Sequence, residues 1–427
     1  MTASFKPPRP ARRRSRSAPQ ARRRVLFMGE GATLAHAARP IALAAALPAS
    51  RYEAIVATPE RYRRWAPANL SWLPLQAQSP EAFAERLSAG KPLFSKARLE
   101  QYVAEDLEQI AQVRPDVVVG DFRLSLAASA RKAGVPYINI SNAYWSPDRP
   151  LRLLRPTLAM FRGWPAPLAE LAFRLVAPSA MRWHARPMDE LLAEHGLKGI
   201  DRDVRRAFTE ADLTLYADLP GLFPEIQQTE SHGFLGPVSW EPEVPAPVWW
   251  GRVPDDRPIA YVSLGSSGDV ALLGRIVGWL RQMGFTVLLA TAERADMAGD
   301  GETLFTADYL PGLAACERAD LVICNGGSPT TTQALLKGRP VLGIASNVDQ
   351  LLNMRAVQAT GAGAGLRADR LGRRAFENAV NRLSGFRAAK AAAAVAADAE
   401  RYDPVQVLSE AIDRLAGGVA GSQGENS

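Results

Sequence analysis

The sequence predicts an α/β protein of two domains, each built on a doubly wound parallel sheet. In both halves of the chain, short apolar runs typical of buried strands alternate with stretches of helical spacing. A length of 427 residues is long for one domain and comfortable for two. Residues 241–257 are rich in proline, include the pair Trp249-Trp250 and show no periodicity, so we expect an interdomain linker there.

The first domain is expected to span residues 25–240. Its strands are predicted from apolar runs such as Asp116-Val-Val-Val119, and its helices from apolar residues spaced three or four apart. The predicted strands are 24–28, 52–57, 116–119, 136–140, 212–216 and 233–235, and the predicted helices are 40–47, 99–113 and 124–133.

The second domain is expected to span residues 258–402, where the same alternation resumes after the linker. The predicted strands are 259–263, 285–290, 303–306, 321–324 and 340–344, and the predicted helices are 330–336 and 388–399. Residues 403–416 are predicted to form a further helix, and residues 417–427 a disordered tail.

The basic charge of the chain is concentrated at its N-terminus. The formal net charge is +7, yet residues 1–24 contain eight arginines and Lys6 without an acidic residue, which leaves the remainder slightly acidic. We interpret residues 1–24 as a solvated, disordered tail, with binding to anionic lipid or to nucleic acid as alternatives. No nucleic-acid partner is expected, because only this tail would support one.

The apolar segments and the cysteines indicate the compartment. No run approaches the about 20 apolar residues of a membrane span, and residues 25–28 are too short for a secretory signal. Cys316 and Cys324 are the only cysteines, have no metal-ligand spacing and are interpreted as core residues. We expect a cytoplasmic protein without a metal site, with attachment to the inner face of the membrane as an alternative.

A glycine-rich turn in the second half has the properties of a phosphate-binding site. The apolar run 319–324 leads into Asn325-Gly-Gly-Ser-Pro-Thr330, and a helix with small hydroxyl residues in its first turn is predicted to start there. Free backbone N–H groups and the positive end of the helix dipole meet at such a turn and favour a phosphate. Asp349 and Gln350 follow the next strand and are suited to hydrogen-bond sugar hydroxyls, so this order predicts a nucleotide-sugar site.

This segment resembles the donor-binding signature of the GT-B glycosyltransferases of the UDP-glycosyltransferase type (family 1). The match covers the glycine turn and the pair Asp349-Gln350, which in the family hydrogen-bonds the transferred sugar. Asn325 stands where the family has a histidine that donates to a donor phosphate, and Gln333 where it has a glutamate that grips the ribose hydroxyls. Both amides can still form hydrogen bonds, although charge-assisted bonds are about twice as strong.

The resemblance implies further contacts with the donor. The loop that ends at Ser267 is similar to the family's strand-end loop at the donor diphosphate, and Tyr309 is placed to stack on a uracil or thymine, with core packing as the alternative. Thr330 with neighbouring N–H groups would stabilise the departing diphosphate. The implied donor-binding residues are Gly265, Ser266, Ser267, Tyr309, Leu310, Asn325, Gly327, Ser328, Thr330, Gln333, Asp349 and Gln350.

The loop after the first predicted strand ends at His36, and a helix is predicted beyond it. This resembles the family's G-H-x-x-P element, with Arg39 for the proline, and the family's histidine is the general base. An acceptor hydroxyl must lose its proton during attack, and imidazole is suited to take a proton near neutral pH. Asp121 follows a buried strand at the same edge of the sheet, where the family has an aspartate that hydrogen-bonds the base. Capping of the helix that follows is the alternative role for Asp121.

Residues 149–187 are apolar and basic, with seven arginines against Glu170 and aromatic residues between them. In the family the equivalent region varies and often builds the acceptor pocket. An amphipathic basic segment is also suited to peripheral contact with an anionic membrane, and a helical lid with solvated arginines is a third interpretation. Either functional interpretation implies a hydrophobic or lipid-like acceptor.

Together these features predict a GT-B fold, with two Rossmann-like domains facing across a cleft and helix 403–416 packing back on the first domain. The resemblance implies an inverting, metal-independent glycosyltransferase without a cofactor, which moves a sugar from a UDP- or dTDP-sugar to a hydroxyl of a hydrophobic small molecule or lipid. A non-catalytic nucleotide-sugar-binding homologue, or a partner protein, is the main alternative because of Asn325 and Gln333. A nucleotide-sugar epimerase of the same architecture is a weaker alternative, since Asp349-Gln350 and His36 argue against it.

Overall fold

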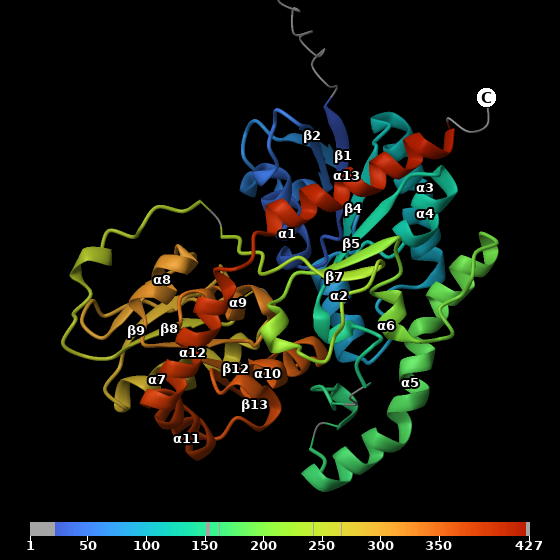
Figure 1. The fold of residues 1–427 in the computed structure, drawn as a ribbon. Helices are drawn as coiled ribbons and strands as arrows, with labels where there is room; N and C mark the ends of the chain where they lie inside the picture. The colour runs from blue at the N-terminus through green and yellow to red at the C-terminus, as the bar shows by residue number, and fades with distance from the viewer. Residues whose placement is uncertain (1–21, 151–153, 162, 242, 266, 424–427) are drawn as a thin grey trace, which may run out of the picture.

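The structure, a computed structural model, describes residues 22–150, 154–161, 163–241, 243–265 and 267–423. It contains two sheets whose strands pair in parallel, with helices on both faces of each sheet (Figure 1). The predicted fold class is therefore confirmed. Most of the predicted basic tail, residues 1–21, lies outside the described residues.

The first sheet has the strand order β3-β2-β1-β4-β5-β6-β7. Its strands are β1 (Arg23–Gly29), β2 (Tyr52–Thr58), β3 (Ser71–Pro74), β4 (Val117–Asp121), β5 (Tyr137–Ser141), β6 (Leu213–Tyr216) and β7 (His232–Phe234). The helices of this part are α1 (Leu34–Ala46), α2 (Pro80–Ser88), α3 (Lys96–Val113), α4 (Leu126–Ala133), α5 (Ala166–Glu194) and α6 (Val204–Ala207).

The second sheet has the strand order β10-β9-β8-β11-β12-β13. Its strands are β8 (Ile259–Ser263), β9 (Thr286–Ala290), β10 (Leu304–Ala307), β11 (Leu321–Cys324), β12 (Val341–Ala345) and β13 (Gly363–Arg367). The helices are α7 (Leu273–Gln282), α8 (Gly312–Arg318), α9 (Ser328–Leu336), α10 (Val348–Thr360), α11 (Arg373–Leu383), α12 (Phe386–Ala399) and α13 (Pro404–Gln423).

Each sheet has one point where the strand order reverses. In the first sheet it lies between β1 and β4, and in the second between β8 and β11. Open parallel sheets bind ligands at the carboxyl ends of the strands on either side of such a point. The catalytic residues were predicted in the segments that follow β1 and β4. Several of the donor-binding residues were predicted in the segments that follow β8 and β11.

Two local predictions near the first switch point are corrected by the structure. The helix predicted to start at Pro40 begins six residues earlier, at Leu34, so His36 lies in its first turn rather than in the preceding loop. Although proline is favoured in the first turn of a helix, α1 holds Pro40 in its interior. Asp121 is the last residue of β4 rather than a residue beyond it, and pairs in register with Gly29.

Strands β3 and β13 and helices α2, α6, α7, α8, α10 and α11 were not predicted, and a helix in the region of α5 was only one interpretation of residues 149–187. The sequence of β13, Gly-Ala-Gly-Leu-Arg, has little apolar bulk because its neighbours leave no room for side chains. A Cβ atom at Gly363 would lie 2.7 Å from both the Val341 carbonyl oxygen and a methyl group of Val357. Because α10 packs closely on β13, the strand has glycines where bulky apolar residues would otherwise have marked it as a strand.

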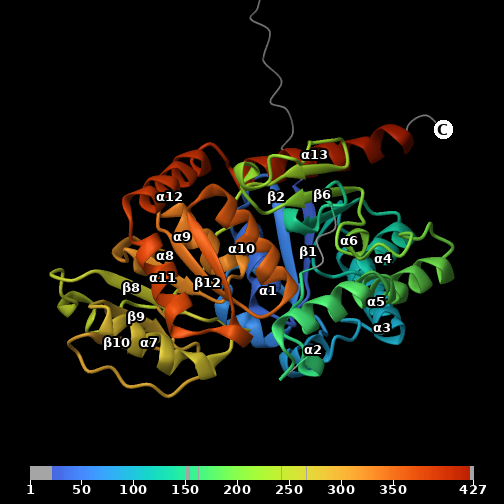
Figure 2. The same ribbon diagram turned by 90° about the horizontal axis from the view of Figure 1, so that it is seen from below.

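Helix α13 lies across the first domain, although it follows the second domain in sequence (Figures 1 and 2). Leu408 and Ile412 pack in one core cluster with Val25 and Phe27 of β1 and Ile41 of α1. The helix continues to Gln423, so the disorder predicted for residues 417–427 is wrong for residues 417–423. Residues 424–427 lie outside the described residues.

Candidate functional site

His36 and Asp121 meet at the switch point of the first sheet. His36 Nδ1 lies 2.8 Å from Asp121 Oδ1, and the Asp121 carboxylate is fully buried. The His36 side chain is 20% exposed, and its ring stacks on Phe122 with centroids 4.3 Å apart. Phe122 has a left-handed backbone, with φ of 57°, at the turn that follows β4. The contact with Asp121 occupies Nδ1, and no described residue forms a hydrogen bond with Nε2.

Arg39 is a member of this cluster that sequence reasoning did not identify. It is buried, its Nη2 donates to Asp121 Oδ1 at 3.0 Å, and its Nε lies 2.7 Å from Oδ2. Burial opposes the charge of Arg39, but Asp121 outweighs it and the pKa of the guanidinium is raised. Its spacing was a usable signal, because residues three apart on a helix share a face, and Arg39 follows His36 by three.

Asp349 of the second domain is joined to the first domain beside this cluster. Trp145 Nε1 donates to Asp349 Oδ1 at 2.8 Å, and Trp145 follows β5 of the first sheet. Burial raises the pKa of Asp349, against the opposing effects of the Trp145 hydrogen bond and of His36. The residue predicted to read the sugar therefore lies near the residue predicted to be the base.

The predicted phosphate loop connects β11 to α9. Gly326 has φ of +79°, and a Cβ atom there would meet Met354 at 2.7 Å, so this turn requires glycine. Gly327 is the N-cap of α9 and supplies no side-chain cap to the first-turn N–H groups. Among the described residues, the hydroxyls of Ser328 and Thr330 have no hydrogen-bond partner. The loop thus offers N–H and O–H donors to an anion.

Asn325 contacts the loop that follows β8, the first strand of the second sheet. Its Nδ2 donates to Ser267 Oγ at 3.0 Å, and its Oδ1 accepts from the backbone N–H of Gly327 at 2.9 Å. Gly265 has a left-handed backbone, with φ of +59°, and its carbonyl accepts from Arg294 at 2.9 Å. The two predicted donor loops are therefore adjacent. Ser266, also predicted at this site, lies outside the described residues.

Gln350 and Gln333 have internal partners. Gln350 forms a capping box with Asn347 at the start of α10, and its Oε1 also accepts from the Ser346 backbone N–H at 2.8 Å. This leaves Gln350 Nε2, 3.4 Å from Ser267 Oγ, as the group that faces the loop. Gln333 Nε2 donates to the Trp240 carbonyl at 3.0 Å. None of these contacts was among the predictions made from the sequence.

Tyr309 lies at the domain boundary, where it contacts an aromatic residue of the first domain. Its ring meets Trp65 edge-on, with centroids 5.3 Å apart, and its hydroxyl donates to Glu293 at 3.4 Å. Leu310 is buried, and the predicted contact of its backbone with a base stays a prediction. Trp65 was not identified from the sequence, because nothing local indicates that it packs on a residue so distant along the chain.

An apolar pocket lies in the first domain close to His36. Phe208 stacks on Phe122, the residue beneath the His36 ring, with centroids 5.4 Å apart, and Phe94 contacts Phe122 from another side. The pocket is lined by Leu93, Phe94, Leu99, Leu124, His184, Pro187, Met188, Val204, Ala207 and Phe208. Residues of α5 therefore contribute to it, within the region predicted to build an acceptor pocket.

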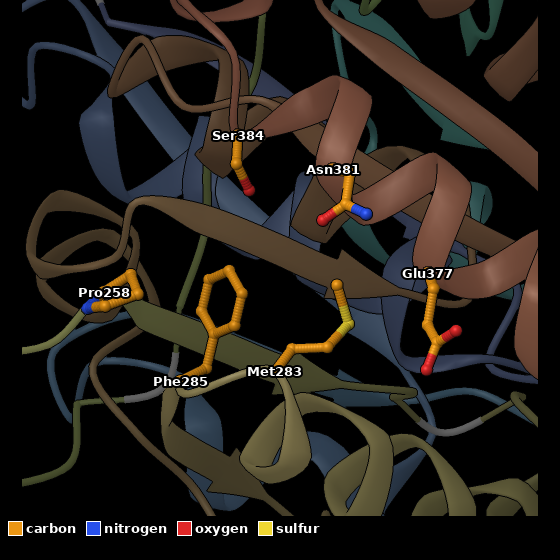
Figure 3. Close-up of a pocket in the computed structure, with 6 residues that line it drawn as sticks. All are labelled: Pro258, Met283, Phe285, Glu377, Asn381 and Ser384. Carbon is orange, nitrogen blue, oxygen red and sulfur yellow. The ribbon is translucent and has the colours of Figure 1, made fainter.

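A second pocket, shown in Figure 3, lies away from these residues. Pro258 and Phe285 precede β8 and β9, so this pocket is at the amino ends of the strands. The candidate site is at the opposite, carboxyl ends, and we do not assign the pocket of Figure 3 to it.

In the part of the chain that the structure describes, no three His, Cys, Asp or Glu side chains form a group able to hold a metal ion. No described helix is long and apolar enough to cross a bilayer. Both cysteines are buried, as predicted, and Cys324 Sγ accepts from the Gly326 N–H at 3.2 Å.

The sequence is similar to one described protein family and to two groups of mycobacterial glycosyltransferases. Residues 283–413 match the family described as erythromycin biosynthesis protein CIII-like, C-terminal domain. The chain is 43% identical over 366 residues to the PGL/p-HBAD biosynthesis glycosyltransferase of Mycobacterium tuberculosis (strain H37Ra), covering 85% of this chain and 86% of the relative. It is 42% identical over 385 residues to the PGL/p-HBAD biosynthesis rhamnosyltransferase of Mycobacterium bovis (strain BCG), covering 90% and 86%.

The fold has close counterparts among solved structures. The spinosyn rhamnosyltransferase SpnG complexed with thymidine diphosphate superposes with a TM-score of 0.61 at 18% identity, covering 91% of this chain and 99% of that chain. The identity to the mycobacterial relatives over most of both chains, together with this GT-B architecture, shows the family. The chain belongs to the family 1 glycosyltransferases of GT-B fold, the UDP-glycosyltransferase type, and is a glycosyltransferase.

Proposed function

We propose that the protein is an inverting, metal-independent glycosyltransferase with His36 as its general base. It moves a sugar from a UDP- or dTDP-sugar to a hydroxyl of a hydrophobic small molecule or lipid. The observation that carries this proposal is the 2.8 Å contact between His36 Nδ1 and buried Asp121, which leaves Nε2 without a hydrogen-bond partner among the described residues.

The His36–Asp121 contact fixes the reactive form of the imidazole. A carboxylate accepts but does not donate, so Nδ1 carries the proton and Nε2 keeps its lone pair. Nε2 takes the proton of the acceptor hydroxyl as its oxygen forms a bond to the anomeric carbon. The bond from that carbon to the diphosphate oxygen breaks at the same time, and the nucleoside diphosphate leaves. Attack on the face opposite the leaving group inverts the anomeric configuration.

The departing diphosphate gains negative charge, which the start of α9 is arranged to stabilise. The uncapped first-turn N–H groups and the hydroxyls of Ser328 and Thr330 are neutral donors at the positive end of a helix dipole. Asn325 Nδ2 and Ser267 lie on the other side of this loop. These groups supply donors to the diphosphate without a metal ion in the proposed reaction.

In the proposed reaction, Asp349 would bind the sugar and the first domain would bind the acceptor. Asp349 accepts from Trp145 through one oxygen and has a second oxygen for a sugar hydroxyl. The aromatic pocket beneath Phe122 has an apolar lining, and its volume of about 20 Å³ would have to widen to admit an apolar acceptor. A rhamnosyltransferase among the relatives and thymidine diphosphate in a related structure support dTDP-deoxyhexoses as donors to be tested first.

A non-catalytic nucleotide-sugar-binding protein is the second candidate. Both amide atoms of Asn325 and the Nε2 of Gln333 have protein partners, which would have to be exchanged for donor contacts. Purified protein with a panel of UDP- and dTDP-sugars and apolar acceptors separates the two. Acceptor-dependent release of nucleotide with matching glycoside supports the transferase, whereas donor binding without turnover across the panel supports the second candidate.

A further inference from the structure

Helix α5 exposes a continuous apolar face to solvent. Leu168, Leu171 and Leu175 follow one another at intervals of three and four residues and therefore share one side of the helix. Leu175 is 74% exposed and Leu171 is 58% exposed. The face, called here the α5 apolar face, comprises Trp164, just before the helix, and Leu168, Leu171, Leu175, Val176 and Trp183.

The opposite side of the same helix anchors it to the domain. Ala169, Phe173 and Ala177 are buried and recur at intervals of four residues. The exposed leucines therefore lie on the side of α5 that faces away from the domain. Figure 1 shows the N-terminal half of α5 at the lower edge of the molecule, beyond the helices that pack on the first sheet.

The charge next to the α5 apolar face is positive. Arg182 and Arg186 lie seven and eleven residues beyond Leu175, on the same side of the helix. Arg186 pairs with Glu190 at 2.6 Å, but no described residue forms an ion pair or hydrogen bond with Arg182. Exposed leucine and tryptophan beside unpaired arginine is the composition of helices that lie in the headgroup region of anionic bilayers.

We propose that α5 docks this protein on an anionic lipid bilayer. Leucine and tryptophan side chains of the α5 apolar face enter the boundary between headgroups and acyl chains, while Arg182 contacts lipid phosphates. A second copy of the chain is the competing occupant. It is disfavoured because an antiparallel two-fold contact centred on Leu175 would leave Arg182 about 10 Å from its centre without an acidic patch to meet it, whereas lipid phosphates meet this charge.

The docked orientation has a consequence that rests on the proposed function. The C-terminal half of α5 supplies His184, Pro187 and Met188 to the apolar pocket near His36. The same helix would therefore touch the bilayer with one face and line the acceptor pocket with another. A lipid acceptor would reach the pocket along α5 without crossing water.

Vesicle sedimentation with the full chain tests the docking. Wild type is expected to bind phosphatidylcholine vesicles that contain phosphatidylglycerol, and to bind pure phosphatidylcholine much more weakly. The double variant Leu171→Ser/Leu175→Ser should lower the partition coefficient at least about tenfold, because two leucines lose their burial in lipid. Arg182→Gln should lower it about fivefold, since one arginine near an anionic surface contributes that factor.

The matched control is Phe386→Ser/Arg387→Gln on α12, where an exposed apolar residue and an exposed arginine lie in the other domain. This variant should bind vesicles like wild type. All variants carry the same basic N-terminal residues, so binding through those residues alone would leave the α5 variants unchanged and overturn the proposal. Equal losses in the α12 control would overturn it as well.

Two further measurements distinguish bilayer docking from dimer formation and from failure of the proposed function. Sedimentation velocity without lipid is expected to give the same mass for wild type and Leu171→Ser/Leu175→Ser. A wild-type dimer that the variant abolishes, without vesicle binding, would replace the bilayer by a second copy. Turnover of a water-soluble acceptor should be equal in all variants, and its absence in all of them would refute the proposed function while leaving the vesicle result to stand by itself.

Discussion

Replacing His36 is the most informative perturbation of the proposed mechanism. His36→Ala removes the base and is expected to lower turnover by ~10²–10⁴, which corresponds to about 3–5 kcal/mol of activation free energy. Donor affinity should stay nearly unchanged, because the predicted phosphate loop lies in the other domain. The variant should also stay folded. The free energy of unfolding that it loses can be estimated from the contacts of the His36 ring.

The loss of stability follows from two contacts of the ring. His36 forms one hydrogen bond to Asp121, worth roughly 1–3 kcal/mol, and stacks on Phe122, worth roughly 1 kcal/mol. Asp121 is not left as an unpaired buried charge, because Arg39 still donates to it at 3.0 Å. A loss of about 2–4 kcal/mol is within the 5–15 kcal/mol typical of folded domains.

The assay follows glycoside and free nucleotide together, with donor Kd measured by calorimetry. His36→Gln is the matched variant, since its amide can donate to Asp121 but cannot act as the base. His195→Gln is the control, because His195 lies after α5 and contacts Glu100. Wild-type turnover in both His36 variants would refute the assignment of the base, and a loss of donor affinity equal to the loss of turnover would place His36 in donor binding instead.

Three further predictions concern the donor loop, the buried cation and a buried acid. Thr330→Val should weaken binding of UDP or dTDP about fivefold through the loss of one hydrogen bond, with acceptor KM unchanged; calorimetry that gives the wild-type nucleotide Kd would contradict the phosphate placement. Arg39→Ala should destabilise the fold by roughly 3–5 kcal/mol in urea titrations, and Arg39→Lys by less, because a buried Asp121 loses its cation; equal stability of wild type and Arg39→Ala would contradict the ion pair. Burial raises the pKa of Glu30 from 4.5 to about 7, against the charge of Arg123, so the folded state binds a proton that the unfolded chain has released, and the free energy of unfolding should fall as pH rises from about 5 to about 7. Glu30→Gln should remove that fall, and an unchanged pH profile in the variant would assign it to other groups.

The parts of the site that could be predicted from sequence are those fixed by local backbone requirements. The turn at Gly326 needs a positive φ and a close approach to Met354, so glycine is required there and the loop is visible in the sequence. His36 and Asp121 were predictable from the family resemblance and from their place next to the same switch point, since Asp121 ends β4 and His36 lies in the first turn of the helix that follows β1.

The parts that could not be predicted depend on contacts distant along the chain. Trp145 and Asp349 are 204 residues apart in sequence, yet they form the hydrogen bond that joins the two domains at the site. Trp65 meets Tyr309 in the same way, across the domain boundary. No local pattern marks either tryptophan, because an aromatic residue at an ordinary core position looks the same in sequence.

Gln350 shows a third case, in which one residue fits two roles. Its position in the family motif implied a sugar contact, and the capping-box spacing to Asn347 was equally present in the sequence. The structure shows the capping contact, and a sugar contact through Nε2 stays a prediction. Asp349→Asn and Gln350→Ala, compared for sugar selectivity, would divide the role between the neighbours.

The proposed reaction can be tested by incubating the purified protein with dTDP- and UDP-sugars and apolar acceptors, while measuring nucleotide, glycoside and anomeric configuration in one reaction. An inverting transferase gives acceptor-dependent release of nucleotide, an equal amount of glycoside, and a configuration opposite to that of the donor. Donor binding without turnover across the panel, or a glycoside of retained configuration, would contradict the proposed reaction.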